Sequence, residues 1–416
     1  MRLRLIQIAM LLLQTVQMVL TFRLWGTAHN YPQVPFFNWL VNAPTWIDQI
    51  GMVCVALAAL SIAAGWISKR QQSKLYSGSW ILLGLSLLGL ILLDQHRDQT
   101  WVWQIMLYVF CLTCMNQARA LSWMRLVTIS IYFYSAISKL DASFLETYGQ
   151  TILDGLLQAL GLSPIWSEQT RWGIVLCFPL FELLVAILLS IPKTQRIGWF
   201  LSLGMHTSLL LAIGPWGLNH QAPVLIWNLF FLIQNTILFW PVPKTSPTEE
   251  HAKVSEDQSK QLAWPGYVMV LVMIFPATEW FNVCDTWPGW GLYSARGSRI
   301  TLSIDESQVD KLPQEYEHLL APPSFEHSLR KVDLHRWAFE QTNAPGYPED
   351  RFQLAVAKAL LARFEIKEGF QIVHLGTSNR LTGKRIKTTI NTPEDLEHFL
   401  KRFYINTQAR EIGVGR

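Results

Sequence analysis

Runs of apolar residues, separated by short polar or basic stretches, occupy most of the chain up to about residue 282. Most runs are about 17–22 residues long, and an α-helix of that length crosses a hydrocarbon layer of about 30 Å. The pattern predicts nine membrane-spanning helices, at about residues 5–25, 49–68, 78–94, 101–117, 124–138, 169–191, 197–214, 223–241 and 264–282.

Two changes of composition divide the chain. Residues 242–263 are polar and charged and contain proline and serine, which is typical of a flexible linker. They separate an eight-span helical bundle at 1–241 from the ninth helix at 264–282. From 283 to 416 acidic and basic residues become frequent, so we expect a domain outside the membrane.

This C-terminal domain mixes strand and helix patterns. Short strand-like runs occur at Ile300–Ile304, Phe370–Leu375 and Arg385–Ile390, and a helix fits residues 350–364. A second helix is expected to begin after Thr392, because a threonine N-cap, a proline and two acidic residues follow one another there. The fold class predicted for the whole chain is therefore an α-helical polytopic membrane protein with a small C-terminal α+β extramembrane domain.

The composition agrees with a membrane protein. Hydrophobic residues make up 50% and charged residues 15% of the chain, whereas soluble proteins carry about a quarter charged residues. Many of the 19 tryptophans lie at the ends of apolar runs, as in an interfacial aromatic belt. Four of the five cysteines lie inside such runs, which argues against a secreted disulfide framework. The sequence gives no nucleic-acid signature, such as a basic stripe or a zinc-finger spacing.

Basic residues in the predicted loops indicate the orientation of the chain. With the N-terminus in the cytoplasm, twelve lysines and arginines fall in or beside cytoplasmic loops and four on the opposite side. Cytoplasmic loops are normally the richer in basic residues. The sequence thus predicts a multi-pass protein of the cell membrane with a cytoplasmic N-terminus and an extracytoplasmic C-terminal domain.

Ionisable side chains in or beside the apolar runs are candidates for function, because charge is costly in hydrocarbon. These residues are Lys139, Asp141, Glu182 and His206, with Asn228, Gln234 and Asn235 as uncharged companions. This set provides too few ligands for a metal site.

Each of these positions has two interpretations. Lys139 is either an interfacial anchor paired with Asp141 or a desolvated lysine that acts as a general base. Glu182 either fixes helix packing through a hydrogen bond or binds substrate. His206 is either a packing residue or part of a site.

Two further pairs are candidates outside this group. Cys111 and Cys114 form a C-x-x-C pair, which serves either as a thiol–disulfide centre or as apolar packing. Arg296 and Arg299 follow the ninth predicted span. They either seat the C-terminal domain on the membrane or hold an anionic lipid head group or a substrate carboxylate.

The segment Tyr134–Phe144, with its SKLDASF core, resembles the K-K-L-D-A-D-W-containing segment of vitamin K-dependent γ-carboxylase and of the wider horizontally transferred transmembrane domain family. Glu182, the segment Thr194–Gly198, His206 and the segment Ile213–Trp216 follow in the order and spacing of that family. The resemblance covers about residues 1–241.

The resemblance implies a lysine base that deprotonates reduced vitamin K or another quinone, so that the substrate is lipid-soluble and the partner is the bilayer. The base of the family falls on Lys139, its aspartate on Asp141 and the histidine of a later span on His206. The chain departs from the motif at Ser138, where the family has lysine. It also departs at two positions nearby, where aspartate and tryptophan are replaced by Ser143 and Phe144. The large substrate-binding region of the carboxylase is absent.

Two other functions remain open from the sequence. One is a thiol-redox membrane protein of the DoxX or methylamine-utilisation type that uses Cys111 and Cys114. The other is a non-catalytic membrane anchor or assembly factor whose C-terminal domain binds a protein partner.

Overall fold

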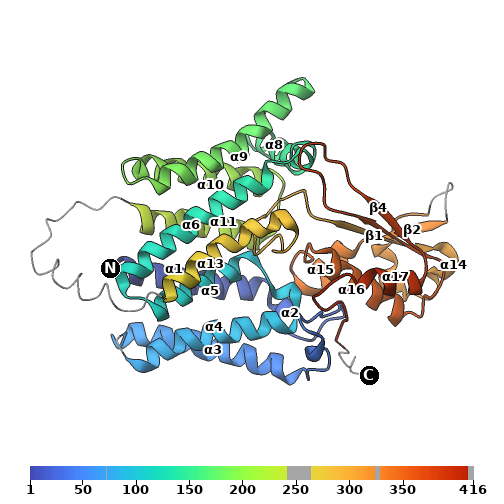
Figure 1. The fold of residues 1–416 in the computed structure, drawn as a ribbon, viewed down its shortest axis with the longest axis horizontal. Helices are drawn as coiled ribbons and strands as arrows, with labels where there is room; N and C mark the ends of the chain where they lie inside the picture. Colours follow the sequence, from blue (N-terminus) through green and yellow to red (C-terminus); the bar gives the residue numbers. More distant parts are fainter. Residues whose placement is uncertain (72, 241–263, 324–327, 411–416) are drawn as a thin grey trace, which may run out of the picture. The chain divides into compact units, whose positions relative to one another are not determined.

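The computed structural model describes residues 1–71, 73–240, 264–323 and 328–410 (Figure 1). Contacts divide the chain into two compact units. The helical unit comprises Met1–Leu13, Gln104–Leu140 and Gly149–Leu292, and the mixed unit comprises Gln14–Trp103, Asp141–Tyr148 and Tyr293–Arg416. The predicted domain limits follow the hydropathy of the chain, whereas these units follow contacts in space, and the two divisions differ. The predicted linker at 242–263 lies outside the described residues.

The fold is mostly helical, as predicted. Within the described residues, seven helices are long and apolar enough to cross a membrane: α1 (Arg2–Leu20), α3 (Trp46–Ile67), α4 (Lys74–Leu93), α6 (Gln117–Lys139), α9 (Glu168–Ser190), α10 (Gln195–Ile213) and α11 (Ala222–Phe239). These helices confirm a helical protein of the membrane type.

The other two predicted spans form shorter elements. The helix α5 covers Thr100–Cys114, and the helix α13 covers Trp264–Ile274. A 3₁₀-helix, η3 (Phe275–Phe281), follows α13 and contains Pro276. Proline has no amide hydrogen and disfavours α-helix before it, which explains why α13 ends there. The count of nine spans stays a prediction.

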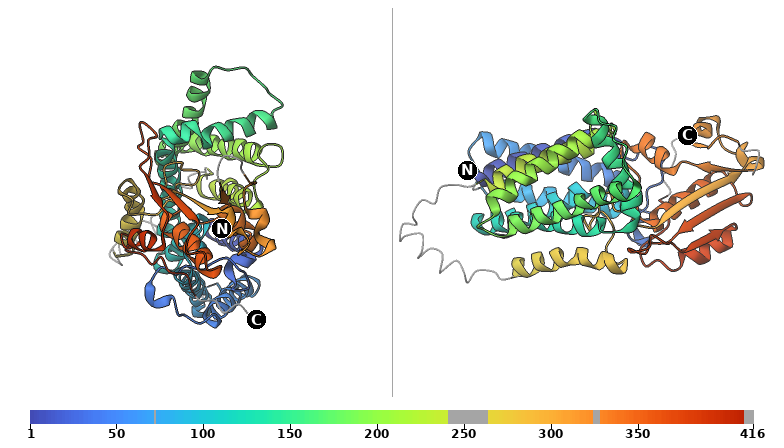
Figure 2. Two further views of the ribbon diagram at one scale, coloured as in Figure 1. Left: turned by 90° about the vertical axis from the view of Figure 1, so that its right-hand side faces the viewer. Right: turned by 90° about the horizontal axis from the view of Figure 1, so that it is seen from above.

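In the helical unit, α6 packs against α9, α9 against α10, and α10 against α11 (Figures 1 and 2). Gly198, near the start of α10, permits the close approach to α9. A Cβ atom there would lie 2.8 Å from the Leu189 nitrogen. The short helices α7 (Ala142–Glu146) and α8 (Tyr148–Ala159) follow α6 in the chain.

The mixed unit contains an antiparallel sheet of order β2-β1-β3-β4 (Figure 2). Its strands are β1 (Arg299–Asp305), β2 (Leu329–Val332), β3 (Phe370–Leu375) and β4 (Lys387–Ile390). Three longer helices come between or after these strands in the chain: α15 (Leu334–Thr342), α16 (Asp350–Arg363) and α17 (Pro393–Leu400). The three predicted strands and both predicted helices are confirmed, whereas β2 and α15 were not predicted.

The core of the sheet domain follows from alternation along the strands. Leu302 and Ile304 of β1, Ile372 of β3 and Phe352 and Val356 of α16 are fully buried. The mixed unit also holds the antiparallel pair α3 and α4 and the short elements α2 (Phe22–Trp25), η1 (Asn38–Leu40), η2 (Gln95–Arg97), α14 (Glu306–Val309) and η4 (Gln314–Leu319).

Candidate functional site

An ion pair joins α6 and α9 inside the helical unit. The ammonium nitrogen of Lys139 lies 2.8 Å from Oε2 of Glu182. It also donates hydrogen bonds to the carbonyl oxygen of Ser135, at 3.1 Å, and to the Ser135 hydroxyl. The structure thus brings together two residues that the sequence singled out and that lie 43 positions apart in the chain.

The side chains of Lys139 and Glu182 remain 11% and 13% exposed. Both side chains are therefore mostly buried, but neither is completely sealed.

His206 lies in a hydrogen-bond network that spans α6, α10 and α11. Its Nε2 is 2.7 Å from the Tyr132 hydroxyl, and its Nδ1 is 2.9 Å from Oδ1 of Asn228. The amide of Asn235 donates to the Tyr132 oxygen, at 2.6 Å, and to the hydroxyl of Ser202, at 3.1 Å. The His206 ring also stacks on Phe231, with 4.6 Å between ring centres.

This network defines the proton positions on His206. The amide nitrogen of Asn228 donates to the Val224 carbonyl, so its Oδ1 is the acceptor that faces the ring. Nδ1 of His206 therefore carries a hydrogen, and Nε2 accepts one from Tyr132. The arrangement suits a neutral imidazole that holds the tyrosine in place.

Tyr132, Ser135 and Lys139 follow one another on one face of α6, at positions i, i+3 and i+7. Seven residues of α-helix rise about 10 Å, so the His206 network and the ion pair form neighbouring polar layers. The sequence identified Lys139 and His206 but not Tyr132, whose side chain is buried.

A further polar layer lies in the same unit and was largely missed. Gln104 donates to Gln234 at 2.8 Å, the hydroxyls of Tyr108 and Thr128 lie 2.8 Å apart, and Trp227 donates to Gln104 at 2.9 Å. Amides and hydroxyls within apolar runs carry no charge to draw attention, although buried polar groups almost always find partners.

Cys111 and Cys114 both carry free thiols. Cys111 is buried and Cys114 is half-buried on α5. The thiol-redox interpretation stays a prediction.

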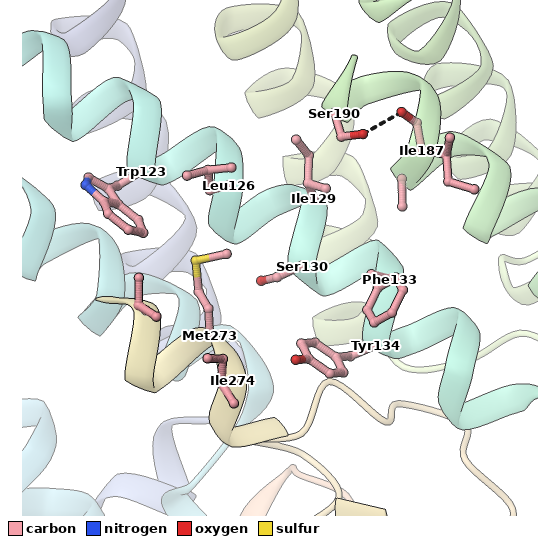
Figure 3. Close-up of a pocket in the computed structure, with 12 residues that line it drawn as sticks. Trp123, Leu126, Ile129, Ser130, Phe133, Tyr134, Ile187, Ser190, Met273 and Ile274 are labelled. Atoms are coloured by element: carbon pink, nitrogen blue, oxygen red, sulfur yellow. Dashed lines mark hydrogen bonds between the residues drawn. The ribbon is translucent and has the colours of Figure 1, made fainter. Parts of the chain in front are cut away.

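A groove of about 480 Å³ is bounded by α6, α9 and α13 (Figure 3). Phe133 and Ile187 are among its apolar lining residues. The hydroxyls of Ser130 and Ser190 face it but donate to carbonyls of their own helices, at 2.8 and 2.7 Å. The groove is therefore mainly apolar and fits an aliphatic or isoprenoid chain better than a polar molecule.

The other three predicted site residues lie in the mixed unit. Asp141 caps α7, since its Oδ1 accepts from the Ser143 amide at 2.8 Å. Burial raises the pKa of its carboxyl, against the Ser143 hydrogen bond and the charges of Arg380 and Arg296. Arg296 is buried, and Arg299 is exposed at the start of β1.

The mixed unit also contains a sealed ion cluster that the sequence did not predict. Asp48 binds the guanidinium of Arg97 through Oδ1, at 2.5 Å, and that of Arg410 through Oδ2, at 2.9 Å. All three side chains are at most 1% exposed. Arg97 also donates to the carbonyls of Leu24 and Gly26. The pair of Arg410 and Asp48 connects a residue near the C-terminus to the first turn of α3.

A second ionic cluster connects α16, β3 and the segment after α17 to one another. His374 donates to Oδ2 of Asp350 at 2.9 Å, and Arg402 lies 3.3 Å from the same oxygen. Burial alone would raise the pKa of Asp350. The hydrogen bond and charge of His374 and the charge of Arg402 outweigh it, and hold that pKa below its usual value.

Three titratable groups around the sealed cluster have shifted pKa values. Burial, together with the charge of Arg97, lowers the pKa of His96 to about 3 and that of His29 to about 4. The hydrogen bond from His96 to the Pro345 carbonyl opposes this shift. Burial raises the pKa of Asp94 to about 6.

These shifts predict that the mixed unit loses stability in mild acid. Between about pH 6 and 4 the unfolded chain binds protons on His29 and His96, while the folded chain binds one on Asp94. For these three groups the difference is about one proton, so together they should lower the free energy of unfolding by about 1.4 kcal/mol for each unit by which the pH falls. His96→Asn should flatten this slope. Thermal unfolding at several pH values tests it, with the exposed His398→Asn as control. A slope unchanged by His96→Asn would contradict the assignment.

No family model, curated protein or solved structure matches this chain. The class that the fold and the polar layers define is a helical protein of the membrane type, with an ion pair between two apolar helices and a small antiparallel sheet domain.

Proposed function

We propose that this chain is a multi-pass membrane enzyme that transfers a proton from a lipid-soluble quinol to Lys139. The membrane part of vitamin K-dependent γ-carboxylase, which residues 1–241 resemble, is the basis for the choice of substrate. In this proposal nine spans cross the membrane, the N-terminus is cytoplasmic and the C-terminal domain is extracytoplasmic.

The observation that carries the proposal is the partly open pair of Lys139 and Glu182, 2.8 Å apart. A carboxylate at this distance can accept a proton from the ammonium. The pair then consists of a neutral amine and a carboxylic acid, and the amine has a lone pair for the substrate. When the quinol hydroxyl gives its proton to that amine, Lys139 becomes an ammonium again beside the developing quinolate.

His206 acts in this scheme as a positioning residue. It keeps the Tyr132 hydroxyl fixed one polar layer away from Lys139, on the same face of α6. The groove between α6, α9 and α13 offers a place for the apolar tail of the substrate, because α6 and α9 also carry the ion pair. Asp141, Arg296 and Arg299 have no assigned step in the proton transfer.

Quinone retention tests this function. The full-length protein is purified in detergent, and bound quinones are identified by mass spectrometry. We expect the wild type to retain quinone and Lys139→Ala to lose most of it. Each 1.4 kcal/mol of lost binding energy weakens the affinity for quinone by about tenfold. Lys193→Ala, an exposed lysine between α9 and α10, is the matched control.

Thermal stability must be measured on the same samples. Loss of quinone from a Lys139→Ala protein that melts like the wild type supports the site. Equal retention by both proteins, or no quinone in either, would contradict the proposed chemistry.

A further inference from the structure

The connection between β3 and β4, residues 376–386, carries two large apolar side chains on its surface. We call it the β3–β4 turn. Leu381 is 90% exposed and Ile386 is 81% exposed. Among the described residues from 293 to 410, Tyr404 is the only other large hydrophobic side chain that is exposed. A single exposed leucine needs no explanation, whereas apolar side chains that gather on one segment mark a candidate contact with a partner or a membrane.

Hydrogen bonds hold the middle of this turn in a defined shape. The amide of Asn379 donates to the carbonyl of Lys384 at 2.9 Å, and the amide of Gly383 donates to the carbonyl of Asn379 at 2.8 Å. The side-chain oxygen of Asn379 accepts from the amides of Leu381 and Thr382, at 3.0 and 3.1 Å. Gly383 has a φ of +64°, a conformation that favours glycine. The backbone at Leu381 is therefore fixed, and its side chain stays outside the sheet domain.

The β3–β4 turn packs against α7. The amide of Ala142 donates to the carbonyl of Arg380 at 2.8 Å. A Cβ atom on Gly383 would lie 3.6 Å from the Ser143 hydroxyl and 3.4 Å from Oε2 of Glu146, which are van der Waals contacts. The turn and α7 both belong to the mixed unit. Leu381, the neighbour of Arg380 in the chain, is thus close to α7.

The chain itself connects α7 to a helix of membrane-spanning length. The α6 helix ends at Lys139, and Ala142 begins α7 three residues further on. Three residues span at most about 11 Å. Because α6 has the length and hydropathy needed to cross a membrane, its end falls near the level of the lipid head groups. The turn that contacts Ala142 is within reach of the same layer.

The side chains of the turn match the chemistry of that layer. Leu381 and Ile386 gain free energy when they leave water for the boundary of the acyl chains. Lys384 and Lys387, the first residue of β4, are exposed as well. Lysine stems lie along apolar surface while the ammonium stays at the level of the phosphates, and anionic lipids attract it. A soluble partner would cover apolar side chains too, but the contact with α7 favours the membrane.

We propose that the β3–β4 turn inserts Leu381 and Ile386 into the head-group region of the membrane that α6 crosses. Lys384 and Lys387 then lie at the level of the lipid phosphates. The contact fixes the sheet domain on the membrane surface at a point far from α6 in the sequence. The insertion requires that α6 crosses the membrane, but it does not depend on the proton transfer by Lys139.

Photocrosslinking to lipid tests the insertion. The full-length protein is reconstituted into vesicles of phosphatidylcholine and phosphatidylglycerol, with photoreactive benzoylphenylalanine in place of one residue at a time. At Leu381, we expect illumination to attach phospholipid to the protein, which mass spectrometry detects. The matched control is Lys367, an exposed residue beyond the opposite end of β3. A strand of this length spans about 20 Å. Attachment at Lys367 should be about tenfold weaker, because burial of one leucine shifts an equilibrium by at least that factor.

A second variant tests the apolar character of the tip. With the photoreactive group at Ile386, Leu381→Asp should weaken lipid attachment by about tenfold, since membrane binding scales with the apolar area that is inserted. Leu381→Met keeps an apolar side chain and should leave the attachment unchanged. Both variants change an exposed residue, so they should melt like the wild type.

Leu57, 56% exposed in the middle of α3, is the positive control for reconstitution. Strong lipid attachment at Leu57, with equally weak attachment at Leu381 and Lys367, would overturn the insertion and leave the proposed spans intact. Crosslinks from Leu381 to a second protein chain instead of lipid would also overturn it. Weak attachment at Leu57 would contradict the proposed spans and the insertion together. Quinone retention is measured separately, so its failure would leave the insertion standing.

Discussion

Asp48→Asn should lower the free energy of unfolding of the mixed unit by about 3–5 kcal/mol, the usual effect of removing one partner from a buried ion cluster. Asparagine keeps the shape of the side chain but leaves two guanidiniums, of Arg97 and Arg410, without a counter-charge. Since both are at most 1% exposed, water cannot replace the lost carboxylate. Chemical denaturation of the purified protein, followed by tryptophan fluorescence, measures the change.

The control for this prediction is an exposed pair in the same unit. Lys358 and Glu397 lie 2.5 Å apart but are 29% and 54% exposed. Glu397→Gln should therefore cost less than about 1 kcal/mol. An Asp48→Asn protein as stable as the Glu397→Gln protein would show that the sealed cluster adds little to the fold.

Lys139 and Glu182 should show strong energetic coupling. We expect each single change, Lys139→Met or Glu182→Leu, to destabilise the helical unit by several kcal/mol, because each leaves a poorly solvated charge behind. The double variant should recover much of that loss, since two apolar side chains of similar size can replace a buried pair. A double-mutant cycle on unfolding free energies measures the coupling.

The exposed pair of Arg171 and Asp154 is the control in the same unit. These side chains are 27% and 59% exposed, so we expect a coupling of about 0.2–1 kcal/mol. Coupling at Lys139 no larger than this would argue against a desolvated pair. The double variant also separates two roles, because a stable protein that no longer holds quinone would indicate a site rather than a packing contact.

The local elements could be predicted because their signals are local. Apolar runs define α3, α6, α9 and α10. The Thr392 side chain accepts from the Asp395 amide at 3.1 Å, as the N-cap pattern predicted. By contrast, β2 has four residues, and two of them, Arg330 and Lys331, are basic. Its pairing with β1 supplies the stability that its own sequence does not indicate.

The candidate site could be predicted only in part. Lys139 and Glu182 stand out as charges in or beside apolar runs, but their pairing depends on how α6 packs against α9. The sequence suggested the neighbouring Asp141 as the partner of Lys139. In the structure Lys139 pairs with Glu182, and Asp141 is the N-cap residue of α7.

Long-range contacts explain the remaining misses. The sequence analysis included Arg97 only as one of the basic loop residues that indicate orientation. Its partner Asp48 lies in the first turn of another helix, and Arg410, the other arginine bound to Asp48, lies near the C-terminus. The hydroxyl of Tyr132 also gave no signal, since a tyrosine in an apolar run is most often a packing residue.

Consumption of reduced vitamin K in the presence of dissolved oxygen, the oxidant that would take electrons from the quinolate formed beside Lys139, tests the central claim most directly. Mass spectrometry would follow the quinol over time, with wild type beside Lys139→Ala and Lys193→Ala. The account predicts consumption by the wild type and by Lys193→Ala, and a rate about 10²–10⁴-fold lower for Lys139→Ala, as expected on loss of a general base. Equal rates for wild type and a folded Lys139→Ala protein, or no consumption by either, would contradict it.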